Sequence, residues 1–128
     1  MAESMPAALA AAQPWQRTAW ISVRTLAATV TVPISEELAF RGFLLRRLIS
    51  QDFEAVSFRK FSWPAILISS ALFGSLHGER WLAGTLAGLV YALVLVRRGR
   101  IGEAVAAHAT TNLLIAVDVL GFGQWQLW

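Results

Sequence analysis

Residues 61–78 read FSWPAILISSALFGSLHG, and residues 81–96 read WLAGTLAGLVYALVLV. Neither stretch contains an aspartate, glutamate, lysine or arginine. An α-helix rises about 1.5 Å per residue, so about 20 apolar residues cross the roughly 30 Å hydrocarbon core of a bilayer. A helix of a soluble bundle would need a polar stripe facing water, and these two stretches have none. They therefore predict helices that cross a membrane.

Two further apolar segments, residues 15–45 and 101–120, lie on either side of this pair. The first contains Arg24, Glu36, Glu37 and Arg41, and the second contains Glu103 and Asp118. The predicted fold class is all-α, a polytopic membrane helix bundle of about four transmembrane helices. Residues 1–14 are rich in alanine and lack the basic start of a secretory signal peptide. We predict that they form an N-terminal tail and that residues 15–128 form the core.

The composition excludes several classes of protein. Of the 128 residues, 56% are hydrophobic and only 15% are charged, against about 25% charged in an ordinary soluble domain. The chain is therefore not disordered. Its net charge of +3 is small and its arginines stand in short clusters between apolar runs, which argues against a nucleic-acid partner. The absence of cysteine excludes disulfides, cysteine-ligated zinc and a thiol nucleophile.

Basic residues predict the orientation in the membrane. They gather in the links at residues 46–60 and 97–100, and lysine and arginine accumulate on the cytoplasmic side. Both links are therefore expected on one, cytoplasmic face, with the two chain ends opposite. Trp125 and Trp128 suit an interfacial position there. An exported N-terminus is consistent with this sequence being the C-terminal part of a longer protein.

Two adjacent glutamates lie inside the first apolar segment, where a charged residue costs about 2.5–3.5 kcal/mol. Glu37 and Arg41 are four residues apart, so a helix places them on one face where they can pair. Glu36 points elsewhere and needs another partner or a proton, as a general acid or base would. The alternative is that Pro33, Ser35 and the glutamates only start a helix.

The chain has two histidines, His77 and His108. The pairs Phe73–His77 and His108–Asn112 are each spaced to share a helix face. Taken singly, either histidine would most often be structural. The helical rise puts Glu36, His77, His108 and Asn112 at overlapping depths, roughly 10–22 Å into the membrane. Because such side chains are costly facing lipid, we expect them to converge on one hydrated internal cavity.

Small residues predict close helix packing. Gly84 and Gly88 form a G-x-x-x-G pair, which more often marks packing inside a bundle than a dimer face.

Three elements in order, Glu36-Glu37-x-x-x-Arg41, Phe73-x-x-x-His77 and His108-x-x-x-Asn112, resemble the motifs of the CPBP (ABI) family of intramembrane proteases. That family includes the type II CAAX prenyl endopeptidases. The resemblance covers roughly residues 25–116. The sequences around the second and third motifs resemble those of the bacterial subgroup found with exosortase-type protein-sorting systems. They read FGSLHGERWLAGTLAGLVYA and RIGEAVAAHATTNLL.

The resemblance implies a peptide-bond hydrolase in a bacterial inner membrane. Glu36 would deprotonate a water that His77 helps to hold, while His108 and Asn112 would donate hydrogen bonds to the oxyanion. Glu37 and Arg41 would form a supporting ion pair. The implied partners are the lipid bilayer, a membrane-protein or lipidated-peptide substrate and protein-sorting machinery. Family members commonly have further spans before the first motif, and this chain has only a short lead-in.

Several alternatives stay open at this stage. Glu36, His77 and His108 could form a zinc site. The sequence lacks the H-E-x-x-H spacing that places two zinc ligands on one turn of a helix. We therefore favour a mechanism that uses no metal and no other cofactor. A non-catalytic accessory or sorting factor of the same fold would be expected to lose the base, which this chain keeps. A proton-coupled carrier also uses buried Glu and His, but it usually shows inverted repeats, and none is visible. The sequence does not name the substrate.

Overall fold

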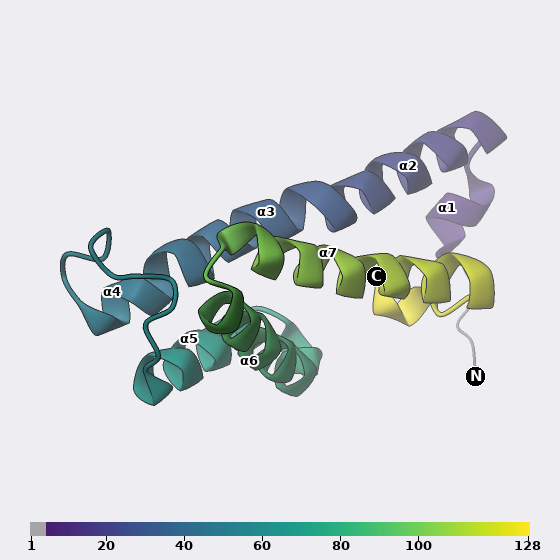
Figure 1. Ribbon diagram of the computed structural model, residues 1–128. Helices are drawn as coiled ribbons and strands as arrows, with labels where there is room; N and C mark the ends of the chain where they lie inside the picture. The colour runs from purple at the N-terminus through teal and green to yellow at the C-terminus, as the bar shows by residue number, and fades with distance from the viewer. Residues whose placement is uncertain (1–4) are drawn as a thin grey trace. The chain divides into compact units, whose positions relative to one another are not determined.

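The computed structural model describes residues 5–128 and is helical, without a strand in that range. This confirms the all-α class. Figure 1 labels the α-helices along the chain. They are α1 (Ala7–Ala11), α2 (Pro14–Leu26), α3 (Val32–Glu37), α4 (Leu45–Ile49), α5 (Trp63–Ser75), α6 (Trp81–Arg98) and α7 (Ile101–Phe122). Two π-helical segments, η1 (Ala27–Thr31) and η2 (Leu38–Leu44), and two 3₁₀ turns, η3 (Gly78–Arg80) and η4 (Trp125–Leu127), complete the set.

The described chain divides into two compact units. One consists of the residues up to Val32 together with Ala109–Trp128, and the other is Pro33–His108. The predicted division between a tail ending at residue 14 and a core stays a prediction. Helix α1 lies within that tail.

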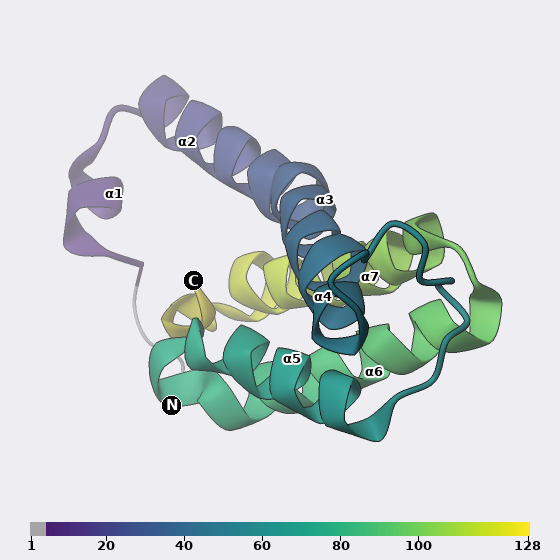
Figure 2. The same cartoon turned by 90° about the vertical axis from the view of Figure 1, so that its left-hand side faces the viewer.

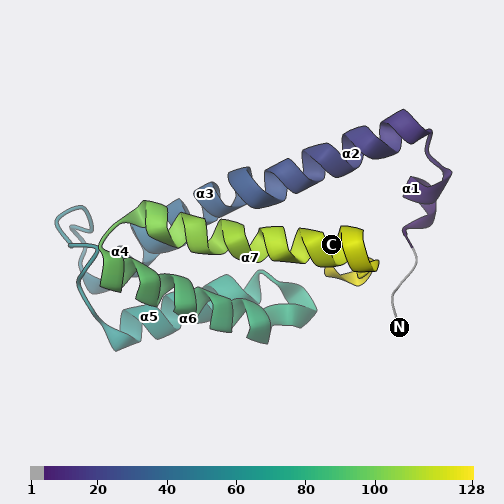
Figure 3. The same ribbon diagram turned by 45° about the vertical axis from the view of Figure 1, so that its right-hand side comes forward.

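In the Pro33–His108 unit, α5 and α6 run antiparallel and side by side (Figures 2 and 3). Their backbones approach closely because glycines face the partner helix. A Cβ built on Gly74 would overlap the side chain and backbone of Thr85, and one built on Gly84 would lie 3.1 Å from the Cα of Gly74. The G-x-x-x-G pair therefore serves packing inside this unit, as predicted.

The two basic links are in contact, while their predicted place on the cytoplasmic face stays a prediction. The Arg59 guanidinium donates to the carbonyl of Arg97 (2.7 Å) and to that of Arg98 (3.0 Å). Both carbonyls lie in the last turn of α6, where they lack intrahelical partners. The helix ends at Gly99, whose φ of +72° is in the left-handed region that glycine adopts readily. A Cβ there would come within 2.6 Å of Arg59.

The helical residues run without a break from Pro14 to Ile49, but two π-helical segments interrupt the α-helical winding. The N–H of Val32 bonds to the carbonyl of Ala27, and the N–H of Leu45 bonds to that of Phe40, both five residues back. Pro33 follows η1 and offers no N–H to a regular α-helical ladder. Such π segments occur frequently at functional sites, and the second one carries Arg41.

Two segments, Gly78–Arg98 (21 residues) and Ile101–Phe122 (22 residues), are long and apolar enough to cross a membrane. Helix α5 is apolar but has only 13 residues. It begins at Trp63, two residues later than the predicted segment at residues 61–78, and ends at Ser75. The count of about four spans stays a prediction.

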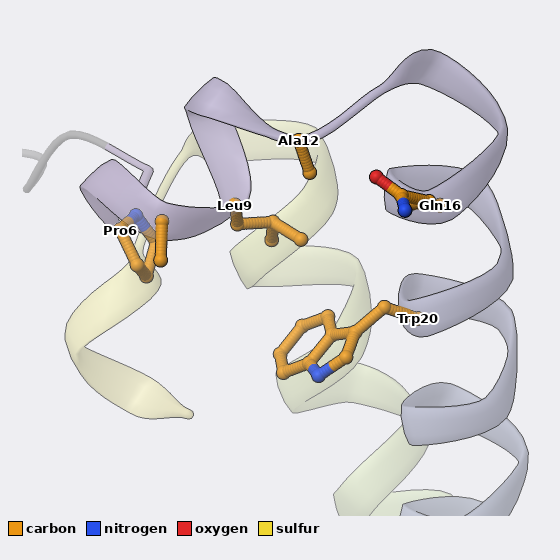
Figure 4. A pocket seen from close by; sticks show the side chains of 6 residues that line it. Pro6, Leu9, Ala12, Gln16 and Trp20 are labelled. Carbon is orange, nitrogen blue, oxygen red and sulfur yellow. The ribbon is translucent and has the colours of Figure 1, made fainter.

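The other compact unit contains the N-terminal helices α1 and α2 and most of the C-terminal helix α7. Arg17 on α2 donates to the carbonyls of Leu9, Ala10 and Ala12 and so satisfies the C-terminal end of α1. A cavity of about 330 Å³ lies between α1 and α2, with Leu9 and Trp20 pointing into it (Figure 4).

Aromatic side chains gather in the same unit. The Trp20 ring lies 6.0 Å from that of Trp128, and the Arg24 guanidinium lies 5.7 and 5.3 Å from the two ring centres. These contacts suit a cation held by interfacial aromatics.

Candidate active site

The ion pair predicted from four-residue spacing is present. Nη1 of Arg41 donates to Oε1 of Glu37 at 3.1 Å, and both side chains are essentially fully buried. Nη2 of Arg41 donates to the carbonyl of Gly88 on α6 at 2.9 Å. The guanidinium also lies 4.4 Å from the centre of the Phe73 ring. Arg41 is therefore held from three sides, by a carboxylate, a backbone carbonyl and an aromatic face.

His108 joins this pair from α7. Its Nδ1 lies 2.9 Å from Oε1 of Glu37, the oxygen that already accepts from Arg41. Its Nε2 lies 3.8 Å from Oε2 of Glu36. The ring is 3% exposed and stacks on Tyr91, with centroids 4.8 Å apart and an interplanar angle of 16°. The structure thus brings together both glutamates, Arg41 and His108.

Glu36 and Glu37 differ sharply in their surroundings although they are adjacent. Glu37 is 0% exposed and uses Oε1 for two hydrogen bonds. The Glu36 side chain is 29% exposed, and its Oε2 is buried without a hydrogen-bond partner among the described residues. Oε2 of Glu37 also lacks a hydrogen-bond partner among the described residues, but Glu37 is fully buried. Glu36 is therefore the carboxylate that combines free acceptor capacity with exposure to a water or a substrate.

His77 contacts Phe73, but by a different route from the one predicted. Helix α5 ends at Ser75, so His77 lies in the turn after the helix, and its side chain is exposed. The prediction that Phe73 and His77 share one helix face was therefore wrong. The chain leaves the helix before His77 and enters a turn that includes Gly78, whose φ is +56°. The turn still places Nδ1 of His77 2.9 Å from the carbonyl of Phe73, with the rings 4.8 Å apart.

Phe73 connects the two histidines. It is 1% exposed, and its ring centre lies 4.8 Å from that of His77 and 5.6 Å from that of His108. Since a carbonyl can only accept, the His77 hydrogen bond places a proton on Nδ1.

Asn112 belongs to the other unit, so its predicted convergence with Glu36 and the histidines stays a prediction. Its amide donates to the carbonyl of Ala28 at 2.7 Å. It also lines a cavity of about 360 Å³ together with Arg24 and apolar side chains of α2 and η1.

Sequence reasoning missed the contribution of Tyr91 and the precise role of the two glycines. A Cβ on Gly84 would lie 2.9 Å from the His77 ring, and a Cβ on Gly88 would lie 2.9 Å from Nη2 of Arg41. Gly84, Gly88 and Tyr91 follow an i, i+4, i+7 pattern, so one face of α6 serves the site. Tyr91 is the only tyrosine in the sequence, and its place on the same helix face as the two glycines was the signal that could have indicated its role.

The zinc site considered from the sequence does not fit this donor set. Within residues 5–128, no group of three or more histidine, aspartate or glutamate side chains is arranged to hold a metal ion. We therefore derive no step through a metal.

Comparison with known proteins identifies the family of this chain. The family model for type II CAAX prenyl endopeptidase Rce1-like proteins matches residues 18–114. No curated protein and no solved structure matches the chain. The match covers about three quarters of the chain and includes all three motifs, and the chain belongs to this family of proteases. The family consists of integral membrane proteins that act on prenylated substrates within the bilayer.

Proposed function

We propose that this chain is an intramembrane endopeptidase that hydrolyses a peptide bond near a membrane-embedded or prenylated C-terminal segment, using a water activated by Glu36. One observation carries the proposal: the Glu36 side chain is 29% exposed and its Oε2 lacks a hydrogen bond among the described residues, beside a histidine and a fully buried, paired second glutamate. A carboxylate in that position can accept a proton from a water.

The other residues take the roles that the family resemblance implies. His77 holds the water through Nε2, which is left to accept a hydrogen bond once Nδ1 has donated to Phe73. Asn112 donates to the oxyanion of the tetrahedral intermediate through the second N–H of its amide. His108 is the other oxyanion donor, and this role requires a proton on Nε2.

The runner-up is a non-catalytic accessory or sorting factor of the same fold. The presence of Glu36, both histidines and Asn112 in the chain favours the protease. A bacterial inner membrane and an association with protein-sorting machinery remain part of the proposal through the family resemblance alone.

The test is cleavage by the full chain reconstituted in liposomes. Two substrates are offered, a prenylated peptide and a peptide with a C-terminal transmembrane anchor. Glu36→Gln is compared with Glu103→Gln, which removes an equivalent carboxylate that lies 3.7 Å from Arg98 and from Arg100. We expect wild type and Glu103→Gln to cut, and Glu36→Gln to lose activity while remaining folded.

Each assay is repeated with a strong zinc chelator. Activity that is lost to the chelator and restored by zinc would contradict the metal-free mechanism. A folded wild type that cuts neither substrate would instead favour the accessory reading.

A further inference from the structure

The protons around Glu37 can be assigned from its hydrogen bonds. Oε1 of Glu37 receives Nη1 of Arg41 at 3.1 Å and Nδ1 of His108 at 2.9 Å. The guanidinium of this ion pair can only donate and its carboxylate can only accept, so Nδ1 of His108 carries a hydrogen. The tautomer of His108 is therefore determined by Glu37, a residue 71 positions away in the sequence.

This assignment has a consequence for Nε2, the other nitrogen of the ring. If the ring is neutral and Nδ1 is protonated, Nε2 has a lone pair and no hydrogen. It would then face Oε2 of Glu36, another acceptor, at 3.8 Å, and could donate to nothing. A role as oxyanion donor is possible only if the ring carries a second proton.

The charges around the ring favour that second proton. Glu36 and Glu37 approach the ring from α3, and Arg41 contacts Glu37 from η2. Helices α5 and α6 supply Phe73 and Tyr91 against it, of which only tyrosine titrates. Two carboxylates and one guanidinium leave one net negative charge, and both carboxylates lie within 4 Å of a ring nitrogen, where an opposite charge favours the charged form of a histidine. An imidazolium at His108 makes the cluster neutral.

We propose that Glu37 is a positioning residue that holds His108 as an imidazolium, with its Nε2–H available to the reacting carbonyl. The inference rests on the proposed function and deepens it. A carboxylate behind an imidazole in this way both orients the ring and stabilises its charged form. Glu37 thus acts through His108 and does not touch the substrate.

The reaction then balances without any further group. The water oxygen bonds to the carbonyl carbon as its proton passes to Glu36, and the oxyanion accepts a hydrogen bond from Nε2–H of His108. When the C–N bond breaks, Glu36 returns that proton to the leaving nitrogen. His108 keeps both protons throughout, so its catalytic contribution depends on the negative charge at Glu37.

The test is Glu37→Gln in the reconstituted full chain, with Glu103→Gln as the matched control on the first turns of α7. Glutamine keeps an oxygen that can accept from Arg41 and from Nδ1, but it removes the charge. We expect kcat to fall about 10²–10³-fold, the usual effect of losing one oxyanion donor, with KM little changed. The ¹⁵N NMR signals of His108, assigned with His77 as reference, should change from a doubly protonated ring to one protonated at Nδ1 alone.

The wild-type spectrum keeps the proposal falsifiable if Glu37→Gln does not fold. A wild-type His108 that is neutral, or protonated only at Nε2, would overturn the proposal. So would a folded Glu37→Gln variant with unchanged kcat and a doubly protonated ring. If wild type cuts no substrate, the proposed function fails, whereas the ¹⁵N signals still decide whether Glu37 holds the ring as an imidazolium.

Discussion

Gly88 offers a sharp test of how the buried cluster is held, because its missing side chain makes room for Arg41. A Cβ at this position would lie 2.9 Å from Nη2 of Arg41, 3.1 Å from Cδ1 of Phe73 and 3.3 Å from Cα of Ser70. Phe73 is 1% exposed, and Arg41 is bonded both to Glu37 and to the carbonyl of Gly88 itself. Gly88→Ala therefore cannot be accommodated by moving a flexible side-chain end into open space.

The expected cost follows from three terms. Overpacking of this kind costs about 1–3 kcal/mol, and weakening a hydrogen bond from a charged group adds about 1.5–3 kcal/mol. Alanine has a higher helix propensity than glycine, which stabilises the folded state by up to about 1 kcal/mol. We expect Gly88→Ala to lower the free energy of unfolding by about 1.5–5 kcal/mol.

The assay is reversible unfolding of the purified protein in mixed micelles of a mild detergent and sodium dodecyl sulfate, followed by circular dichroism. Gly102→Ala is the matched control, because a Cβ on Gly102 meets nothing within 4 Å and the residue lies in the same unit. The control should be as stable as wild type or slightly more stable. Equal stability of the two variants would refute the close approach of Arg41 to Gly88.

Two further substitutions examine the neighbours of this contact. Arg41→Met leaves the buried carboxylate of Glu37 without its guanidinium partner, and breaking a buried pair in this way should cost about 3–5 kcal/mol in the same unfolding assay; a loss below about 1 kcal/mol would contradict the pairing. Gly84→Ala brings a Cβ to 2.9 Å from the His77 ring, so kcat should fall as the ring is displaced. Gly42→Ala, whose nearest contacts at 3.8 and 3.9 Å are ordinary, should keep its kcat, and equal activity of the two variants would argue against a role for the His77 position.

Part of the site was predictable because it depends on local spacing. Glu37 and Arg41 are four residues apart and pair as any helix would pair them, even though the helix is π-wound through Leu38–Leu44. Charge distribution predicted only that the two basic links share one face, and their contact through Arg59 is a finding of the structure. The position of His77 was less predictable, because spacing does not reveal that α5 ends at Ser75.

Composition and order along the chain by themselves determined the all-α class, the apolar character of the helices and the three motifs of the protease family. These properties depend on residues close in sequence or on their average chemistry. Only the tertiary structure decided that one oxygen of Glu37 serves both Arg41 and His108, and that Tyr91 stacks on the histidine. Those contacts join residues on different helices, whose rotation and approach depend on how glycine-lined faces pack, and local periodicity carries no information about that packing.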